Sequence, residues 1–207
     1  FIVSSDPLYP MVDDGVLLSA MLKVKPTGKL LAIHCENQAI IDFYSERLSR
    51  LDSVAPIEHA RSRPEVSELE AIQRVILLAK DTGVRLHVLH LSAGRGAEMV
   101  ASAKLHGVPV SVETCPHYLV LTDEALNRYG PYAKCNPPLR GEDNQALLWQ
   151  EMLSGKIDCL VSDHSPYTSA DKARGLEDIR LSPPGIAAVE LGLPLMISEG
   201  VNKNKIT

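Results

Sequence analysis

Short apolar runs alternate with segments of helical periodicity along the chain, and this alternation limits the fold more than any other feature. Strands are predicted at residues 30–33, 86–91, 108–114 and 157–162, and helices at 15–23, 67–83, 94–106 and 143–153. Glycines follow three of these helices, as is typical of helix ends. Strands that alternate with helices pair in parallel through right-handed crossovers. The sequence therefore predicts an α/β fold, either a doubly wound sheet or a barrel.

The last of these runs carries the most informative polar residue. Residues 157–162 read as a strand buried on both faces, Asp163 follows it, and Pro166 prevents further strand pairing. A carboxylate at the C-terminal end of a buried parallel strand occupies the place where α/β barrels keep catalytic groups. Taken alone, Asp163 is equally well explained as the cap of a turn.

Two histidines stand at equivalent positions. His34 follows the run 30–33, and His90 lies at the end of the run 86–91. Because the C-terminal ends of parallel strands open on one face, these rings and the Asp163 carboxylate are expected to lie close together. Neutral imidazole and carboxylate suit zinc-type cations. The pattern predicts a metal site of His34, His90 and Asp163, although a single histidine would more often be a core or surface residue.

The other histidines are expected to have lesser roles. His87 lies three residues before the histidine at the strand end, so it points to the opposite face and is interpreted as structural. His164 adjoins the strand-end aspartate and is expected to pack or to support a ligand. His59 and His106 are expected to be solvated, and His117 to shape the rim of a pocket.

Local signals also predict how two helices begin. Asp13 and Asp14 are expected to cap the first helix, because carboxylates stabilise the positive end of a helix. Ser67 and Glu70 have the spacing of a capping box.

Composition narrows the class of protein. The 207 residues carry a formal net charge of −5 without any run rich in lysine or arginine, which argues against nucleic acid or an anionic membrane as partner. The weakly charged stretch 181–198 contains three prolines and Glu190, so it is not a membrane span. No GxGxxG or Walker loop follows a strand, which weakens a nucleotide-binding reading. The four cysteines lack CxxC spacing and are expected to be reduced, mostly buried thiols of a cytoplasmic protein.

Five phrases together resemble the cyclic amidohydrolases, the family of allantoinases, dihydroorotases and dihydropyrimidinases (hydantoinases). They lie at residues 34–37, 86–90, 113–119, 134–140 and 158–166, in the order of the family. The likeness is strongest to the allantoinase branch, through residues 60–64 and 148–166. Dihydroorotases are the second choice, through residues 168–172 and 183–186. That branch usually has a substrate-binding histidine where this chain has Tyr167.

The resemblance implies a TIM-type (β/α)8 barrel with two divalent metal ions, expected to be Zn²⁺. His34 and His90 match the histidines that hold one metal. Asp163 matches the carboxylate that binds the other metal and acts as general acid and base. The substrate-binding residues are expected to be Asn136, Tyr167 and Gly185.

The implied reaction is hydrolytic opening of a cyclic amide or ureide, first of all of allantoin to allantoate. Dihydroorotate, dihydropyrimidines and hydantoins are alternative substrates, and a non-catalytic scaffold is an alternative role. The family commonly forms dimers or tetramers, so a homo-oligomer is expected.

Two features of the family's pattern do not occur in residues 1–207. There is no His-x-His pair, and the family's carboxylated lysine would lie two residues before Phe1. Residues 1–5 themselves read as a strand. The chain is therefore expected to be one partial barrel domain, from about the fourth strand onward, without the first three strands and without the C-terminal end.

Overall fold

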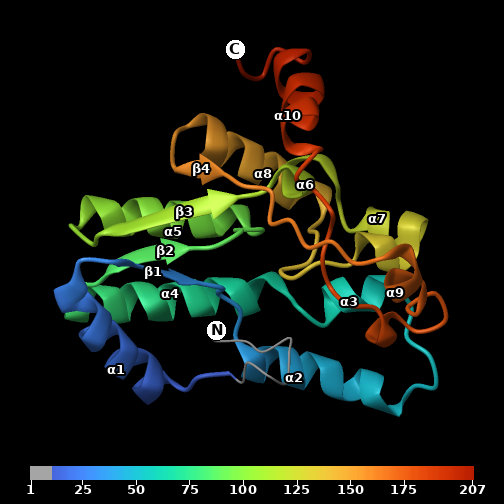
Figure 1. The fold of residues 1–207 in the computed structure, drawn as a ribbon, viewed down its shortest axis with the longest axis horizontal. Coiled ribbons are helices and arrows are strands. Elements are labelled where there is room, and N and C mark those ends of the chain that lie inside the picture. Colours follow the sequence, from blue (N-terminus) through green and yellow to red (C-terminus); the bar gives the residue numbers. More distant parts are fainter. Residues whose placement is uncertain (1–10) are drawn as a thin grey trace.

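The computed structural model describes residues 11–207, so the strand predicted at residues 1–5 lies outside the described residues. Four parallel strands form a sheet in the order β1-β2-β3-β4, which is also their order in the chain. The strands are β1 (Leu30–Ile33), β2 (Arg85–Val88), β3 (Val110–Thr114) and β4 (Cys159–Leu160). Their carboxyl ends point toward the side of the molecule that holds α3, α7 and α9 (Figure 1). The predicted parallel arrangement is confirmed.

Helices connect the strands and cover one face of the sheet. They are α1 (Asp14–Val24), α2 (Gln38–Glu46), α3 (Ile57–Arg61), α4 (Glu65–Thr82), α5 (Gly94–Leu105), α6 (Pro116–Val120), α7 (Glu124–Tyr129), α8 (Glu142–Leu153), α9 (Ser169–Ala173) and α10 (Gly192–Leu195). Short 3-10 turns lie at Lys25–Thr27, Arg47–Arg50, Gly130–Ala133 and Ile179–Leu181, and a π-helical turn at Met196–Val201. Helix α4 packs between α1 and α5, and α5 packs against α8. None of the helices in residues 11–207 is long and apolar enough to cross a membrane.

The two faces of the sheet differ in character because successive strand residues point to opposite sides. Leu86 and Val88 of β2 and Val112 of β3 are almost fully buried, together with Ile72 and Val75 of α4. Each aliphatic side chain buried in this way contributes about 1.5–3 kcal/mol to folding. The other face carries polar side chains at paired positions: His87 of β2 pairs with Ser111 of β3, and Glu113 of β3 pairs with Cys159 of β4. The helices therefore pack on the aliphatic face, and the ligand-type side chains lie on the other face.

Several predicted boundaries are confirmed, and two need correction. Asp13 caps α1, its carboxylate accepting a hydrogen bond from the Val16 amide at 2.8 Å. Gly83 ends α4 in the left-handed conformation, with φ of 67°. The predicted capping box is wrong, because α4 already begins at Glu65 and the Ser67 hydroxyl donates to the carbonyl of Pro64. Strand β2 ends at Val88, before the predicted boundary at residue 91.

The strand predicted at 157–162 is shorter and more exposed than expected. β4 comprises only Cys159 and Leu160, and both side chains are exposed. The physical reason is that β4 pairs with β3 alone and forms the edge of the described sheet. Of the cysteines, Cys35, Cys115 and Cys135 are buried free thiols as predicted, whereas Cys159 is exposed.

Candidate metal centre and substrate groove

The two histidines at the ends of β1 and β2 meet. Nδ1 of His34 lies 3.0 Å from Nε2 of His90, and both side chains are buried. Neighbouring parallel strands bring them together, since β1 pairs with β2 up to Ile33 and Val88. The expected proximity is observed for the two histidines. Asp163 does not complete a group of three ligand atoms within 4.8 Å with them in the described part of the chain, and the role of all three residues as metal ligands stays a prediction. Two imidazole nitrogens that face each other at this distance share a single proton or a cation.

The backbone conformation singles out two of the three predicted ligands. His90 has φ of 34° and Asp163 has φ of 44°, and Asn204 is the one other non-glycine residue with positive φ in the described part of the chain. This left-handed region is sterically unfavourable for residues with a Cβ atom. Such conformations cluster at functional sites, where the surrounding structure enforces them.

The surroundings of His90 favour its neutral form. Burial lowers its pKa, the neighbouring His34 lowers it further, and the negative charge of Asp163 acts in the opposite direction. A neutral imidazole retains the lone pair that a metal ion needs. Nδ1 of His90 is buried without a hydrogen-bond partner among the described residues.

A carboxylate that the sequence analysis did not single out lies behind His34. Glu36 is fully buried, and its Oε2 accepts hydrogen bonds from Nε2 of His34 at 2.8 Å and from Nη1 of Arg63 at 2.7 Å. Burial alone would raise the pKa of Glu36, but Arg63 and His34 together lower it to about 2. The spacing could have revealed this residue, because side chains two positions apart in an extended segment lie on the same side.

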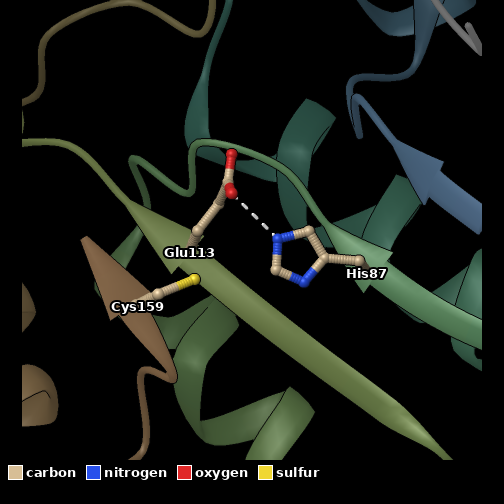
Figure 2. A group of neighbouring side chains, drawn as sticks. All are labelled: His87, Glu113 and Cys159. Carbon is tan, nitrogen blue, oxygen red and sulfur yellow. Dashed lines mark hydrogen bonds and ion pairs between the residues drawn. The ribbon is translucent and has the colours of Figure 1, made fainter. Parts of the chain in front are cut away.

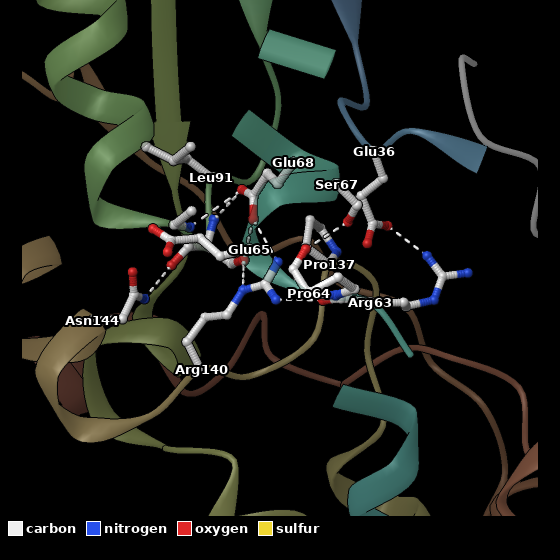
Figure 3. Close-up of polar contacts among 12 residues, drawn as sticks. Glu36, Arg63, Pro64, Glu65, Ser67, Glu68, Leu91, Pro137, Arg140 and Asn144 are labelled. Atoms are coloured by element: carbon white, nitrogen blue, oxygen red, sulfur yellow. Dashed lines mark hydrogen bonds and ion pairs between the residues drawn. The ribbon is translucent and has the colours of Figure 1, made fainter. Parts of the chain in front are cut away.

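A second buried carboxylate, Glu68 in α4, organises the neighbouring loops. It accepts hydrogen bonds from the Ser92 amide at 2.8 Å, the Ser92 hydroxyl at 2.6 Å and the Ala93 amide at 3.3 Å. Nη2 of Arg140 pairs with it at 2.9 Å. Figure 3 shows this pair beside the pair of Arg63 and Glu36. Nη1 of Arg140 also donates to the carbonyl of Arg63 at 2.5 Å, which links the two pairs.

The predicted substrate-binding residues lie around one groove of about 1280 Å³. Asn136, Tyr167 and Arg63 line it. The Oδ1 atom of Asn136 is buried without a partner among the described residues, so an acceptor is available there. Gly185 does not itself line the groove, but it adjoins the wall at Tyr167: a Cβ atom on it would come within 2.5 Å of Ser165 and 2.9 Å of Tyr167.

Two buried lysines hold that wall in place. Nζ of Lys134 donates to the carbonyls of Ile179 and Ser182, and Nζ of Lys172 donates to those of Lys134, Pro183 and Gly185. Burial lowers the pKa of each lysine to about 8. Because each ammonium group satisfies several carbonyls, both lysines are best understood as supports of the groove.

The remaining histidines follow the predictions in part. His106 is exposed, as expected, whereas the prediction for His59 is wrong: it is buried and donates to the carbonyl of Cys135 at 2.9 Å. The short helix α3 packs it against the 134–138 loop, and burial lowers its pKa to about 3. His117 is buried against Tyr118, not at a rim. His164 is exposed, and its Nδ1 accepts from the Val189 amide.

The polar face of the sheet carries a second group of ligand-type side chains. Figure 2 shows His87, Glu113 and Cys159, whose ligand atoms lie within 4.8 Å of one another. His87 bonds Ser111 through Nδ1 at 2.7 Å and Glu113 through Nε2 at 2.9 Å. The other oxygen of Glu113 accepts from the amide of His90 at 3.2 Å. The interpretation of His87 as structural fits these contacts, which support the backbone beneath the histidine pair.

Known allantoinases are similar to this chain in sequence. No family model matches the chain. An allantoinase from Rubrobacter xylanophilus is 40% identical over 194 residues, which are 94% of this chain and 42% of that protein. An allantoinase from Escherichia coli O1:K1 is 40% identical over 192 residues, which are 93% of this chain and 42% of that protein. The chain thus spans less than half the length of these relatives.

Solved structures give the same answer for the fold. The L-hydantoinase (dihydropyrimidinase) from Arthrobacter aurescens superposes with a TM-score of 0.94 at 34% identity, over 99% of this chain and 46% of that one. The dihydropyrimidinase from Brevibacillus agri gives a TM-score of 0.91 at 34% identity, over 100% and 45% of the two chains. The predicted fold, part of a (β/α)8 barrel of the amidohydrolase type, is confirmed. The chain belongs to the cyclic amidohydrolases.

Proposed function

We propose that the protein containing this chain is a metal-dependent hydrolase that opens a cyclic amide, most directly allantoin to allantoate. The observation that carries the proposal is the meeting of His34 and His90 at 3.0 Å at the carboxyl ends of neighbouring strands. Asp163 follows the next strand but one, β4, at the same edge of the sheet. The allantoinase relatives support the choice of ring.

The donors in this chain fit a divalent cation. His34 and His90 would hold it through the two facing nitrogens, and Asp163 would serve a second cation. These are suitable ligand types for Zn²⁺. The family's His-x-His pair does not occur in residues 1–207, so we propose that the remaining ligands, with the carboxylated lysine, come from elsewhere in the intact protein. A bound divalent cation supplies a Lewis acid that acidifies water and polarises a carbonyl.

The chain's own residues move the proton and hold the ring. Asp163, partly buried at the strand end, accepts the proton of the attacking water and delivers it to the departing ring nitrogen, which is a poor leaving group when unprotonated. Asn136 offers its unpartnered Oδ1 to a ring N–H. Tyr167 also lines the groove, and Gly185 allows it to pack closely.

A second candidate substrate is a hydantoin or dihydropyrimidine ring. The structural neighbours are hydantoinases and dihydropyrimidinases by name, at TM-scores up to 0.94. Parallel assays of the intact protein with allantoin, hydantoin and dihydrouracil would separate the two. Turnover of allantoin alone is the expected result, and turnover of none, with no bound metal, would favour a non-catalytic scaffold.

The role of Asp163 has a direct test in the same protein. Asp163→Asn should lower kcat by about 10²–10⁴-fold, because the amide cannot shuttle the proton. Asp81→Asn is the matched control, since Asp81 is exposed in α4, and it should retain wild-type turnover. Near-normal turnover of Asp163→Asn would contradict the proposed mechanism.

A further inference from the structure

Glu36 occupies a position that neither the fold nor the metal ligands alone explain. We infer that Glu36 is a positioning residue, which holds the ring of His34 with its Nδ1 lone pair toward a divalent cation, and that Arg63 holds Glu36 in place. The inference rests on the proposed function, since it takes His34 as a ligand. It deepens that function by assigning two residues whose work is to orient the site.

The first step concerns the proton on the His34 ring. Nε2 of His34 lies 2.8 Å from Oε2 of Glu36, and Nδ1 lies 3.0 Å from the ring of His90. An ionised carboxylate accepts hydrogen bonds and cannot donate one. The proton of neutral His34 therefore resides on Nε2, and Nδ1 carries the free lone pair. A carboxylate behind a ligating histidine fixes both the tautomer and the angle of the ring.

The second step concerns the fixed place of the carboxylate. The Glu36 side chain is fully buried, and the Arg63 side chain is 11% exposed. Both donors converge on Oε2, and Oε1 has no partner among the described residues. A buried ion pair by itself adds little net stability, because desolvation offsets the attraction. A contribution to folding stability therefore does not explain why Glu36 is hydrogen-bonded to a ring nitrogen of His34.

The third step connects the pair to the groove. Arg63 lines the groove that also holds Asn136 and Tyr167. Its carbonyl accepts a hydrogen bond from Nη1 of Arg140 at 2.5 Å, so its backbone is anchored from the other side. A continuous set of contacts therefore runs from the groove wall through Arg63 and Glu36 to His34.

The neighbouring ring is held differently, which makes the effect of Glu36 specific. Nδ1 of His90 has no partner among the described residues, and the amide of His90 donates to Glu113 at 3.2 Å. Its backbone is fixed by the left-handed conformation and this amide contact, and its Nε2 contacts His34 at 3.0 Å. Replacing Glu36 should thus loosen the ring of His34 directly and leave the backbone of His90 in place.

The test measures the His34 tautomer in the metal-free intact protein by ¹⁵N NMR of labelled histidine. The wild-type ring should be protonated on Nε2. In Glu36→Gln, the charge that fixes this tautomer is lost, and a population protonated on Nδ1 should appear. The affinity for Zn²⁺ should fall by about 10–100-fold, and kcat should fall with little change in KM.

Glu68→Gln is the matched control. It removes the same charge from a buried pair with an arginine, but Glu68 makes no hydrogen bond or ion pair to a histidine within residues 11–207. Its His34 tautomer and Zn²⁺ affinity should equal those of the wild type. An unchanged tautomer with an affinity within about twofold of wild type in Glu36→Gln would overturn the positioning role.

If either variant fails to fold, the His34 tautomer of the wild-type protein alone still tests the positioning role. A His34 ring protonated on Nδ1 in the wild type would overturn the positioning role while the proposed hydrolysis stands. Absence of any divalent-cation binding by the wild-type protein would instead overturn the proposed function, and the ligand role of His34 with it.

Discussion

Two buried carboxylates, Glu36 and Glu68, each face an arginine, and the rest of their contacts differ (Figure 3). The ion-pair distances are 2.7 Å to Arg63 and 2.9 Å to Arg140. Glu68 also accepts hydrogen bonds from two backbone amides and one hydroxyl group in the loop after β2, at Ser92 and Ala93. Glu36 makes one further contact, to the ring of His34. The same kind of ion pair, glutamate with arginine, thus fixes a loop at Glu68 and a candidate metal ligand at Glu36.

These different contacts indicate which property should change when each carboxylate is removed. A carboxylate that satisfies several backbone amides is part of the chain's hydrogen-bond inventory, so its removal leaves buried donors unpaired. Glu36 accepts no hydrogen bond from a backbone amide among the described residues, so its removal mainly frees the ring of His34. Glu68 should therefore matter more for stability, and Glu36 more for metal binding.

The largest expected effect is on stability. Glu68→Gln should lower the free energy of unfolding by about 3 kcal/mol, because Arg140 remains buried with its partner charge removed. Glu36→Gln also removes the partner charge of a largely buried arginine, Arg63, but it loses fewer hydrogen bonds, so it should lower the free energy of unfolding by a smaller amount, about 2 kcal/mol. Urea unfolding followed by circular dichroism measures both. Equal losses would break the comparison.

The second effect is a pH dependence of stability on the Arg63 side, at His59. Burial, together with the charges of Arg63 and Lys134, lowers the pKa of His59 to about 3. The unfolded state, with a histidine pKa near 6.5, binds a proton first as the pH falls. The stability associated with neutral His59 is thus complete above pH 6.5 and is lost between pH 6.5 and about 3.

Between pH 7 and pH 5 this loss amounts to about 2 kcal/mol. His59→Gln, which can still donate to the Cys135 carbonyl, should remove that part of the slope. His106→Gln is the control, because His106 is exposed at the end of α5, and it should keep the wild-type slope. Unfolding measured at both pH values gives the comparison. A slope in His59→Gln equal to that of the wild type would show that the Arg63 side carries no such proton-linked stability.

Local signals predicted the elements of this fold well. The ends of α4 and α5 follow from Gly83 and Gly107, which adopt the left-handed backbone that other residues avoid. The meeting of His34 and His90 follows from a rule of topology, that the carboxyl ends of parallel strands share an edge. Such features depend on short stretches of sequence and on chirality, so one sequence is sufficient to predict them.

Long-range pairing could not be predicted in the same way. Glu68 and Arg140 are far apart in the chain, and many arginines could have paired with that glutamate until the loops closed. His59 was expected in solvent because its neighbours are polar, but the 134–138 loop covers it. The left-handed backbone of His90 and Asp163 has no sequence signal, since neither is glycine. These features are imposed by tertiary packing.

The smallest effect concerns a single hydroxyl on the Glu68 side. The Ser92 hydroxyl donates to Glu68 at 2.6 Å and accepts from Nε of Arg140 at 3.0 Å, so it joins both members of the pair. Ser92→Ala should lower the free energy of unfolding by about 1.5 kcal/mol, as expected for hydrogen bonds to charged groups. Ser62→Ala is the matched control, because that buried hydroxyl donates to the neutral carbonyl of His59 and its loss should cost about 0.5–1 kcal/mol. Zn²⁺ affinity should be unchanged in both. Weaker Zn²⁺ binding in Ser92→Ala would mean that the Glu68 pair also orients the metal site, since Arg140 would then transmit the change to Arg63 through the bond that joins the two pairs.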